Sequence, residues 1–534
     1  MRASLGLAVL LLVACDGSAE NDAGPSDAAP DAAPLPPPEV MTTHGPVVGQ
    51  RESGSLAFLG IPYAAPPVGP LRFAMPVPPE PWTEPRPSRR PPRCVQDALG
   101  LSLPSQEDCL YLNVHAPDPL PDGAPVLVWI HGGGFVFGEG VQTDGGTAGD
   151  VLASRFGVVV VSMNYRLGPY GFLAHPALAG ASGASGNWGF ADQQLALRWV
   201  RDNIASFGGD PDNVTIFGES AGGLSVCLHL IAEGSAGLFA RAISQSGLCD
   251  TALGTLAEAE AVGAAFAARL GCDGASDVAA CLRAPSADAI READDASPGV
   301  FTELGRERAW WPIVDGALIG GSFRERVRAG AFARVPTIVG WNGDEGTLFV
   351  MLAEQAGTSV DASSYADAIA LLAAAFGVAA EDVLAQYPLE RYPDAGAALA
   401  AALGDAGFAC PSRRAARLLA EAGADVRVYH FTYRDAAFQL PPTRELGAFH
   451  SAEIQYVFGH PAALGRARFT GDDAALHDAM AGYWTRFAAS GDPNGGDAPA
   501  WPAYDPEGDA HLVLDRTIAA SRGAGADACA LWEP

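Results

Sequence analysis

The strongest constraint on this chain is a serine between two glycines, at the junction of a strand pattern and a helix pattern. Residues 214–217 (VTIF) are typical of a buried strand, and residues 224–232 (LSVCLHLIA) are typical of a helix. Residues 218–222 (GESAG) lie between them, with Ser220 at the centre. This motif at a strand-to-helix turn places the serine on a strained bend, where its hydroxyl is exposed as a nucleophile. The alternative is a chance match in a chain rich in Gly and Ser, and the flanking patterns disfavour it.

Short apolar runs alternate with helical segments along the rest of the chain. One helical segment, residues 190–204, has Leu195, Ala196, Trp199 and Val200 on one side. Strands that alternate with amphipathic helices favour helical crossovers and a mostly parallel sheet. The sequence therefore predicts the α/β class. The buried strands are expected at residues 126–130, 158–163, 214–217, 242–244, 337–339 and 426–431.

A glycine run is the second candidate for chemistry. Residues 126–135 (VLVWIHGGGF) carry an apolar strand pattern that ends in Gly132, Gly133 and Gly134. Backbone N–H groups in such a loop, together with the N–H of Ala221, would form an oxyanion hole that stabilises negative charge in the transition state. A plain flexible glycine turn is the alternative, but it does not explain why the turn directly follows a buried strand.

A serine nucleophile of this kind needs a histidine base and an acid, which follow it in the order acid, then His. Downstream of the serine, His229 and His430 fall in helical and strand patterns, where core packing is the better interpretation. His450 lies in a loop before a helical run and is the strongest candidate for the base. Asp344 and Glu345 directly follow a strand pattern, where catalytic residues of such sheets lie. Spacing alone does not choose between these two acids.

The net charge of the chain excludes one class of partner. The formal charge is -29, and the sequence contains no lysine, so arginine is the only permanently charged basic residue. Affinity for phosphate backbones comes largely from Lys and Arg, so we expect no nucleic-acid partner. Compositional bias explains the missing lysine better than adaptation to salt or acid, because net charge affects solubility more than fold.

The first residues have the features of a signal for export. One arginine precedes a short apolar run that ends at Cys15, and this run is too short to cross a bilayer. The segment resembles a bacterial lipoprotein signal, with residues 1–14 removed and Cys15 lipidated. An ordinary signal peptide, giving a periplasmic or secreted protein, is the alternative. Residues 15–40 have few large apolar side chains and are expected to form a disordered tether, followed by a catalytic domain at 41–534.

Export favours disulfides among the other eight cysteines, because disulfides persist outside the reducing cytosol. Cys94 and Cys109 flank one short loop, and Cys272 and Cys281 flank another. Metal sites usually show tighter cysteine spacing with histidine nearby, so we expect no metal and no other cofactor. The pairing of the remaining cysteines does not follow from spacing.

Several motifs in fixed order resemble those of the type-B carboxylesterases, the family that includes the cholinesterases, from about residue 43 to the C-terminus. This resemblance implies an α/β-hydrolase fold with a large, mostly parallel central sheet flanked by helices. It also implies Ser220, Glu345 and His450 as a catalytic triad, and Gly133, Gly134 and Ala221 as oxyanion donors. The motifs are EDCLYLNV at 107–114, FGGDPDNVTIFGESAGG at 207–223, HGGGF at 131–135, MNYRLGPYGFL at 163–173, GNWGFADQQLALRWV at 186–200, QSG at 245–247, DEGT at 344–347 and HSAEIQYVFG at 450–459.

The same resemblance implies a set of scaffold contacts. Disulfides are expected between Cys94 and Cys109, Cys272 and Cys281, and Cys410 and Cys529, which leaves Cys227 and Cys249 unpaired. Ion pairs are expected between Arg72 and Glu107 and between Arg166 and Asp192, and Glu219 and Glu453 are expected as buried carboxylates beside the triad. Buried charges need partners, so these residues are assigned to the scaffold first.

Departures from the cholinesterases bear on the substrate. Cholinesterases hold a quaternary ammonium against aromatic rings. Here the loop 95–108 has no aromatic residue, and Leu348 stands where the second ring would be. We therefore expect hydrolysis of small, neutral, apolar carboxylic esters. The alternatives are an inactive adhesion or binding protein of the same fold, a large or polymeric ester as substrate, and preference for an amide or carbamate.

Overall fold

The apolar runs expected as strands all lie in one sheet. The computed structural model describes residues 35–98, 101–102, 104–142, 146–180, 183, 185–294, 309–438, 442–461 and 469–533. Within these residues, eleven strands form the main sheet. In spatial order they are β18 (Ala519–Arg522), β17 (Ala510–Leu514), β16 (Val426–Phe431), β15 (Thr337–Asn342), β12 (Arg241–Gln245), β11 (Gly209–Glu219), β9 (Ala124–Ile130), β10 (Val159–Met163), β8 (Tyr111–Pro117), β4 (Ser55–Pro62) and β3 (Gln50–Arg51).

The centre of this sheet is parallel and its margins are antiparallel. The strands from β17 through β16, β15, β12, β11 and β9 to β10 pair in parallel, whereas β18, β8, β4 and β3 pair antiparallel. Parallel neighbours need helical crossovers, which cover both faces of the sheet. The predicted α/β-hydrolase architecture is thus confirmed.

Strand β9 shows why both faces are apolar. Val126, Val128 and Ile130 belong to one core cluster, and the alternate residues Leu127 and Trp129 belong to another. Successive strand residues point to opposite faces, so a strand covered on both sides needs apolar residues at every position. All five of these side chains are essentially inaccessible to solvent.

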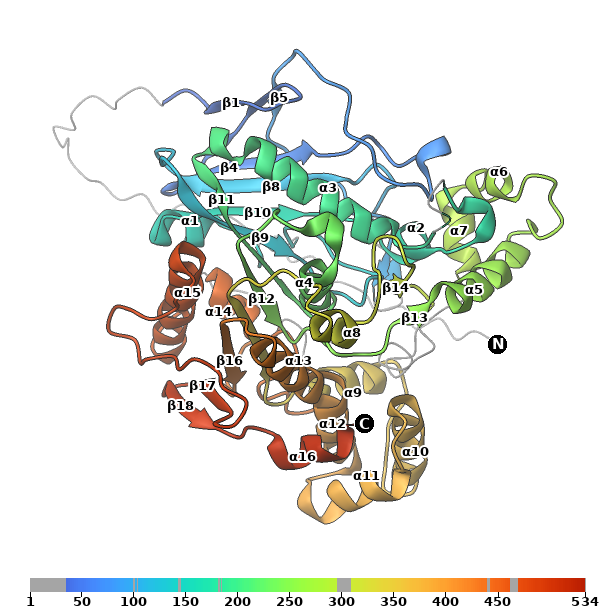
Figure 1. Ribbon diagram of the computed structural model, residues 1–534, viewed down its shortest axis with the longest axis vertical. Helices are drawn as coiled ribbons and strands as arrows, with labels where there is room; N and C mark the ends of the chain where they lie inside the picture. Colours follow the sequence, from blue (N-terminus) through green and yellow to red (C-terminus); the bar gives the residue numbers. More distant parts are fainter. Residues whose placement is uncertain are drawn as a thin grey trace, which may run out of the picture. The chain divides into compact units, whose positions relative to one another are not determined.

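Helices cover the two faces as two groups (Figure 1). Side chains of α3, α4, α8 and α13 share the first core cluster with one face, and those of α1, α14 and α15 share the second cluster with the other. The helices are α1 (Asp150–Phe156), α2 (Gly168–Phe172), α3 (Trp188–Asn203), α4 (Ala221–Ile231), α5 (Leu256–Arg269), α6 (Val278–Arg283), α7 (Ala287–Ala293), α8 (Phe323–Arg328), α9 (Gly346–Gln355), α10 (Tyr365–Phe376), α11 (Ala380–Gln386), α12 (Ala395–Gly404), α13 (Cys410–Glu421), α14 (Ile454–Phe458), α15 (Asp472–Ser490) and α16 (Ala526–Trp532).

A third core cluster lies beside the sheet, among α9 to α12 and α16. A π-helical turn, Asp405–Ala409, joins α12 to α13. Three small sheets complete the strands. In the first, β2 (Pro46–Val48) lies between β1 (Glu39–Met41) and β5 (Arg86–Pro87) and pairs with both. The other two pair β13 (Gly254–Thr255) with β14 (Ile313–Val314) and β6 (Asp97–Ala98) with β7 (Leu101–Ser102).

Four disulfides cross-link the described cysteines, where three were expected. Cys94–Cys109, Cys272–Cys281 and Cys410–Cys529 pair as the resemblance implies. The expectation of two unpaired cysteines was wrong, because Cys227 pairs with Cys249. Helix α4 brings the two Cα atoms to within 5.5 Å, a proximity that a separation of 22 residues does not reveal. Four disulfides are typical of a protein exported from the reducing cytosol.

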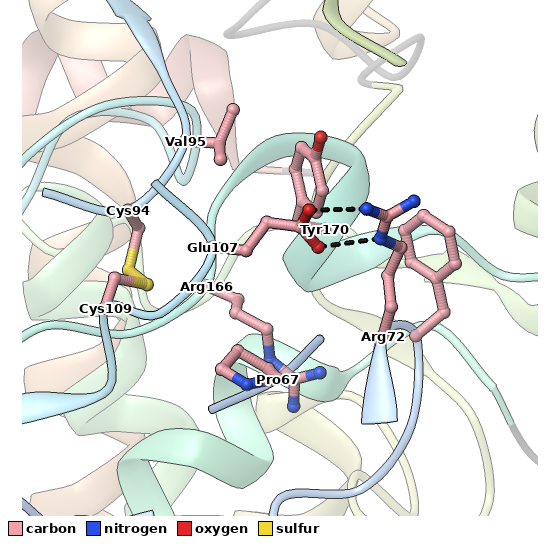
Figure 2. Close-up of a pocket in the computed structure, with 9 residues that line it drawn as sticks. Pro67, Arg72, Cys94, Val95, Glu107, Cys109, Arg166 and Tyr170 are labelled. Atoms are coloured by element: carbon pink, nitrogen blue, oxygen red, sulfur yellow. Dashed lines mark hydrogen bonds and ion pairs between the residues drawn. A yellow bond between two sulfur atoms is a disulfide. The ribbon is translucent and has the colours of Figure 1, made fainter. Parts of the chain in front are cut away.

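Both expected ion pairs are present. Arg72 contacts both carboxylate oxygens of Glu107, at 2.7 and 2.5 Å, and Arg166 contacts both oxygens of Asp192, at 2.8 and 2.7 Å. Figure 2 shows the first pair at the wall of a small cavity that the Arg166 guanidinium also lines. Its described lining contains none of the candidate catalytic residues, so this cavity is not the candidate active site.

The N-terminal expectations concern residues outside the described part. The expected signal peptide, Cys15 and most of the expected tether precede residue 35. Strand β1 begins at Glu39, two residues before the expected start of the catalytic domain. No single helix among the described residues is both long and apolar enough to cross a membrane.

Candidate active site

Ser220 lies on the sharp turn between β11 and α4. Its φ of 58° is in the left-handed region, which is strained for a residue with a side chain. Its backbone N–H donates to the carbonyl of Gln245 at 2.9 Å, which fixes the turn to the end of β12. A Cβ atom on Gly222 would lie 1.9 Å from the carbonyl oxygen of Ile130, so the motif needs glycine there. The turn thus has the predicted strand-to-helix geometry.

The glycine loop after β9 lies directly against this turn. A Cβ atom on Gly132 would lie 3.0 Å from Cβ of Ser220, and Gly133 and Gly134 have φ values of 101° and 60°. Ala221 is the first residue of α4, where backbone N–H groups lack helical partners and the helix dipole favours negative charge. The three candidate oxyanion donors are thus on segments that meet beside Ser220.

Glu345 is buried just after β15 and holds three hydrogen bonds. Its Oε2 lies 2.6 Å from Nδ1 of His450. Its Oε1 accepts from the backbone N–H of Asn342 at 2.7 Å and from the hydroxyl of Ser246 at 2.6 Å. A carboxylate fixed in this way can orient the imidazole and stabilise its protonated form.

Asp344, the other candidate acid, has a different set of partners. Its Oδ2 accepts from the backbone N–H of Ala448 at 2.8 Å, and both oxygens contact Arg434. An isolated parallel β-bridge also pairs the backbone of Asp344 with that of Phe449, the residue before His450. Asp344 therefore braces the loop that carries His450, while Glu345 contacts the imidazole itself.

His450 is buried beside two aromatic rings, which stack on each other. The centroids of Phe408 and Phe349 lie 4.5 and 5.0 Å from that of the imidazole. Its Nε2 lies 3.1 Å from Oε1 of Glu219, the residue before the serine. Among the described residues, the hydroxyl of Ser220 makes no hydrogen bond in this structure. Catalytic hydrogen bonds often form only once substrate is bound.

Two further buried carboxylates complete the environment of the imidazole. Glu453 accepts from Nε2 of Gln245 at 3.0 Å and from Nδ2 of Asn342 at 2.6 Å. Burial raises its pKa, and burial also raises the pKa of Glu219 to about 8. Burial by itself lowers the pKa of His450, but the charges of Glu219 and Glu345 outweigh it and raise that pKa to about 9. The site therefore retains protons to higher pH than exposed groups do.

The sheet explains why these residues meet. Ser220, Ser246 and Glu345 follow the carboxyl ends of β11, β12 and β15, and the glycine loop follows β9. The loop with His450 lies in the connection after β16. These strands are parallel neighbours, so their carboxyl ends share one edge, where ligands bind in open α/β sheets.

Sequence reasoning missed three contacts at this site. The QSG motif contains Ser246 but does not indicate its contact with the acid, although its position after a buried strand is a usable signal. The sequence alone does not indicate that Phe349, which follows Leu348, lies beside the imidazole. Phe408 is brought in by the π-helical turn, and nothing in its surrounding sequence indicates that. Within the described residues, no cluster of His, Cys, Asp and Glu side chains could hold a metal.

Comparison with known proteins shows the family. The model of the carboxylesterase family matches residues 36–532. The chain belongs to the carboxylesterase family. It is 35% identical to a liver carboxylesterase of Sus scrofa, over 93% of each chain. It is also 35% identical to a medium-chain fatty acyl-CoA hydrolase precursor of Anas platyrhynchos, over 91% of this chain and 90% of the relative.

A solved structure supports the same assignment. The chain superimposes on PNB esterase with a TM-score of 0.77 and 33% identity, over 93% of this chain and 99% of the other. Family, relatives and fold agree, so this carboxylesterase is an ester-hydrolysing enzyme with the α/β-hydrolase fold. The predicted fold class, the resemblance and the enzyme class are confirmed.

Proposed function

We propose that this carboxylesterase cleaves esters through an acyl-enzyme, with Ser220 as nucleophile, His450 as general base and Glu345 as the acid. The observation that carries the proposal is the 2.6 Å contact between Glu345 and Nδ1 of His450, at the sheet edge where Ser220 lies on its strained turn. Glu345 accepts the Nδ1 proton, so Nε2 is the nitrogen left to accept a proton.

The chemical steps follow from these positions. The Oγ of Ser220 attacks the ester carbonyl carbon as Nε2 of His450, turned from Glu219 toward the serine, accepts the hydroxyl proton. The N–H groups of Gly133, Gly134 and Ala221 stabilise the oxyanion that develops. The tetrahedral intermediate collapses, and His450 donates its proton to the departing alcohol. A water molecule then attacks the acyl-enzyme by the same route and releases the carboxylic acid.

A non-catalytic adhesion or binding role is the alternative for this fold, since fold alone does not establish activity. That role predicts loss of the serine, the acid or the histidine. All three are present, and two of them are in contact through a short hydrogen bond. Ester hydrolysis is therefore the better-supported function.

The mechanism is tested with Ser220→Ala and with a matched pair of acid variants. Ser220→Ala should lower kcat for a short p-nitrophenyl ester by several orders of magnitude while the thermal melt stays unchanged. Glu345→Gln should lower kcat by roughly 10³- to 10⁴-fold, because the imidazole loses its orienting charge. Asp344→Asn removes the same charge one residue away and should cost far less. Substantial activity in Ser220→Ala would overturn the mechanism.

For the substrate, we propose neutral esters with apolar acyl groups longer than acetyl. The rings of Phe349 and Phe408 lie beside His450, and the segment 248–254 after the QSG motif has no Trp or Phe to narrow the acyl side. The loop 95–108 and position 348 lack the aromatic rings that attract a cation. The name of the Anas platyrhynchos relative, a medium-chain fatty acyl-CoA hydrolase, is consistent with a longer acyl group.

A panel of esters that varies acyl length and alcohol charge tests this preference. Butyryl and hexanoyl aryl esters should show a higher kcat/KM than acetylcholine, because neither the loop 95–108 nor position 348 offers a ring to offset the desolvation of a cation. An amide and a carbamate in the same panel test whether either is cleaved in preference to the esters. Efficient, choline-selective turnover would overturn the substrate preference and leave the triad untouched.

We also propose that residues 1–14 are a signal peptide, that Cys15 carries lipid, and that residues 15–40 tether the catalytic domain at 41–534 to a bacterial envelope membrane. The support is the apolar run that ends at Cys15 and the export indicated by four disulfides. Cys15→Ser should move the protein from the membrane to the soluble fraction. Cleavage elsewhere without an acyl adduct, measured by intact mass, would instead mean a periplasmic or secreted protein.

A further inference from the structure

The segment Ser246–Asp250, which follows β12 and is called the β12 turn below, has an unusual backbone. Ser246 and Leu248 have φ values of 50° and 47°, so two non-glycine residues lie in the left-handed region. Such conformations are strained and persist only where the surroundings enforce them. Leu248 and Cys249 are almost fully buried, so the turn is a packed part of the molecule.

The β12 turn holds the proposed catalytic acid. The backbone N–H of Ser246 donates to the carbonyl of Gly340 at 2.8 Å, and its hydroxyl donates to Oε1 of Glu345 at 2.6 Å. The opposite oxygen of Glu345 contacts His450. A shift of Ser246 therefore removes one of the two hydrogen bonds that hold Oε1 of the carboxylate that orients the imidazole.

A covalent bond holds this turn to the helix that begins at the nucleophile. Cys249 in the turn is bonded to Cys227 on α4, which lies seven residues, about two helical turns, after Ser220. The hydroxyl of Ser244 donates to the carbonyl of Gly223 on the same helix and lies 3.2 Å from the sulfur of Cys249. The link therefore joins the element that carries the serine to the segment that supports the acid.

Noncovalent contacts also anchor the far end of the turn. Asp250 accepts hydrogen bonds from Arg324 at 2.7 Å and from Arg414 at 3.0 Å. These contacts lead to α8 and α13 rather than to α4. Between Asp250 and the end of β12, the disulfide is the covalent tie to α4 that opposes relaxation of the two left-handed residues.

We propose that the Cys227–Cys249 disulfide is a positioning link of the active site, which keeps Ser246 in contact with Glu345 by holding the strained β12 turn on α4. The proposal rests on the proposed triad. Without the bond, the turn relaxes toward ordinary backbone angles, the Ser246 hydroxyl leaves Glu345, and the imidazole is oriented less well. Ser246 acts on Glu345 rather than on the ester, so the loss of orientation falls on kcat. Residues 248–250 of the turn belong to the proposed acyl side, and p-nitrophenyl acetate, with its short acyl group, keeps their effect on KM small.

The test removes the disulfide by Cys227→Ala with Cys249→Ala and compares it with a matched control, Cys272→Ala with Cys281→Ala, at the other short disulfide. Each is assayed with a p-nitrophenyl ester well below its own melting temperature. Loss of the positioning link should lower kcat by about 10- to 100-fold with KM changed less than about twofold, as small misplacements do. The control should keep kcat. Cys227→Ala alone, which leaves the Cys249 thiol beside Ser244, serves if the double variant does not fold.

A double-mutant cycle with Ser246→Ala separates positioning from general scaffolding. If the disulfide acts through Ser246, removing it in the Ser246→Ala background should change kcat less than about twofold, because coupled residues are non-additive. Unchanged kcat in the folded double variant, or an equal fall in both backgrounds, would overturn the proposal. Ser220→Ala distinguishes the failures: if it remains active, the triad itself is wrong, and if it is inactive, only the positioning role is lost.

Discussion

At the scale of single residues, the site holds more carboxyl groups around the imidazole than a general base requires. Glu219 faces Nε2 of His450 at 3.1 Å, and Glu345 contacts Nδ1 at 2.6 Å. Both carboxylates favour the imidazolium, which raises the pKa of His450 to about 9. A protonated imidazole cannot accept the serine proton. We therefore expect kcat/KM to keep rising with pH beyond the pH at which an ordinary histidine loses its proton. Glu219 is therefore a determinant of the pH optimum.

Glu219→Gln should move this dependence toward lower pH. Removal of an adjacent charge changes a pKa by about one to three units. The acidic limb of the kcat/KM profile should therefore move to a pH that is lower by about the same amount. The pH profile of kcat/KM is the measurement. Glu453→Gln is the matched control, because Glu453 is the weakest of the three carboxylate influences on His450 and should shift the limb less. Equal shifts in the two variants would contradict this assignment.

Residue types and order predicted the candidates, but not their contacts. Ser220 and His450 could be chosen from motif context, whereas Asp344 and Glu345 are adjacent acids after the same strand. Their roles differ because one contacts the backbone of Ala448 and the other contacts the imidazole, and both contacts form across more than a hundred residues. The resemblance to a family, rather than spacing, chose Glu345.

At the scale of elements, the six expected strands were predictable because their apolar side chains are buried on both faces of the sheet. Strands β9, β10, β15 and β16 coincide with apolar runs, and their parallel order brings the catalytic segments to one edge. The Cys227–Cys249 bond and the place of Phe408 were not predictable in the same way. Both depend on how a helix or a π-helical turn is oriented in the fold. The local sequence does not predict that orientation.

The buried Arg166–Asp192 pair fixes the segment after β10 to α3, and its removal tests that connection. Both side chains are at most 3% exposed, and Asp192 also accepts the backbone N–H of Arg166. Arg166→Met should cost about 3–5 kcal/mol of unfolding free energy, because Asp192 stays buried without its partner.

Replacing both partners should recover much of that loss. In Arg166→Met with Asp192→Leu, the desolvation cost of both charges disappears, and such replacements of buried pairs are often neutral. Urea unfolding at neutral pH measures the free energy of unfolding of the unmodified protein, the single variant and the double variant. A double variant as unstable as the single one would show that the ion pair itself, rather than the uncompensated charge, determines the stability.

At the scale of the whole molecule, charge and cross-links act over longer distances. The net charge of -29 attracts cations, but screening at physiological salt limits such attraction to about 8 Å. Contacts inside the site should therefore decide which ester is cleaved. Stability is different, because a cross-link between distant residues constrains the whole unfolded chain.

The Cys410–Cys529 disulfide should be the most stabilising of the four. It closes a loop of 119 residues, against 9 for Cys272–Cys281. In the chain-entropy description these loops correspond to about 5 and about 2.6 kcal/mol. The native contacts around it are also extensive, since Trp532 of α16 donates to the hydroxyl of Tyr387 at 2.9 Å. Cys410→Ala with Cys529→Ala should therefore unfold at a lower urea concentration than Cys272→Ala with Cys281→Ala. Equal midpoints with equal urea dependence would mean that native contacts, rather than unfolded-chain entropy, set the contribution of each bond.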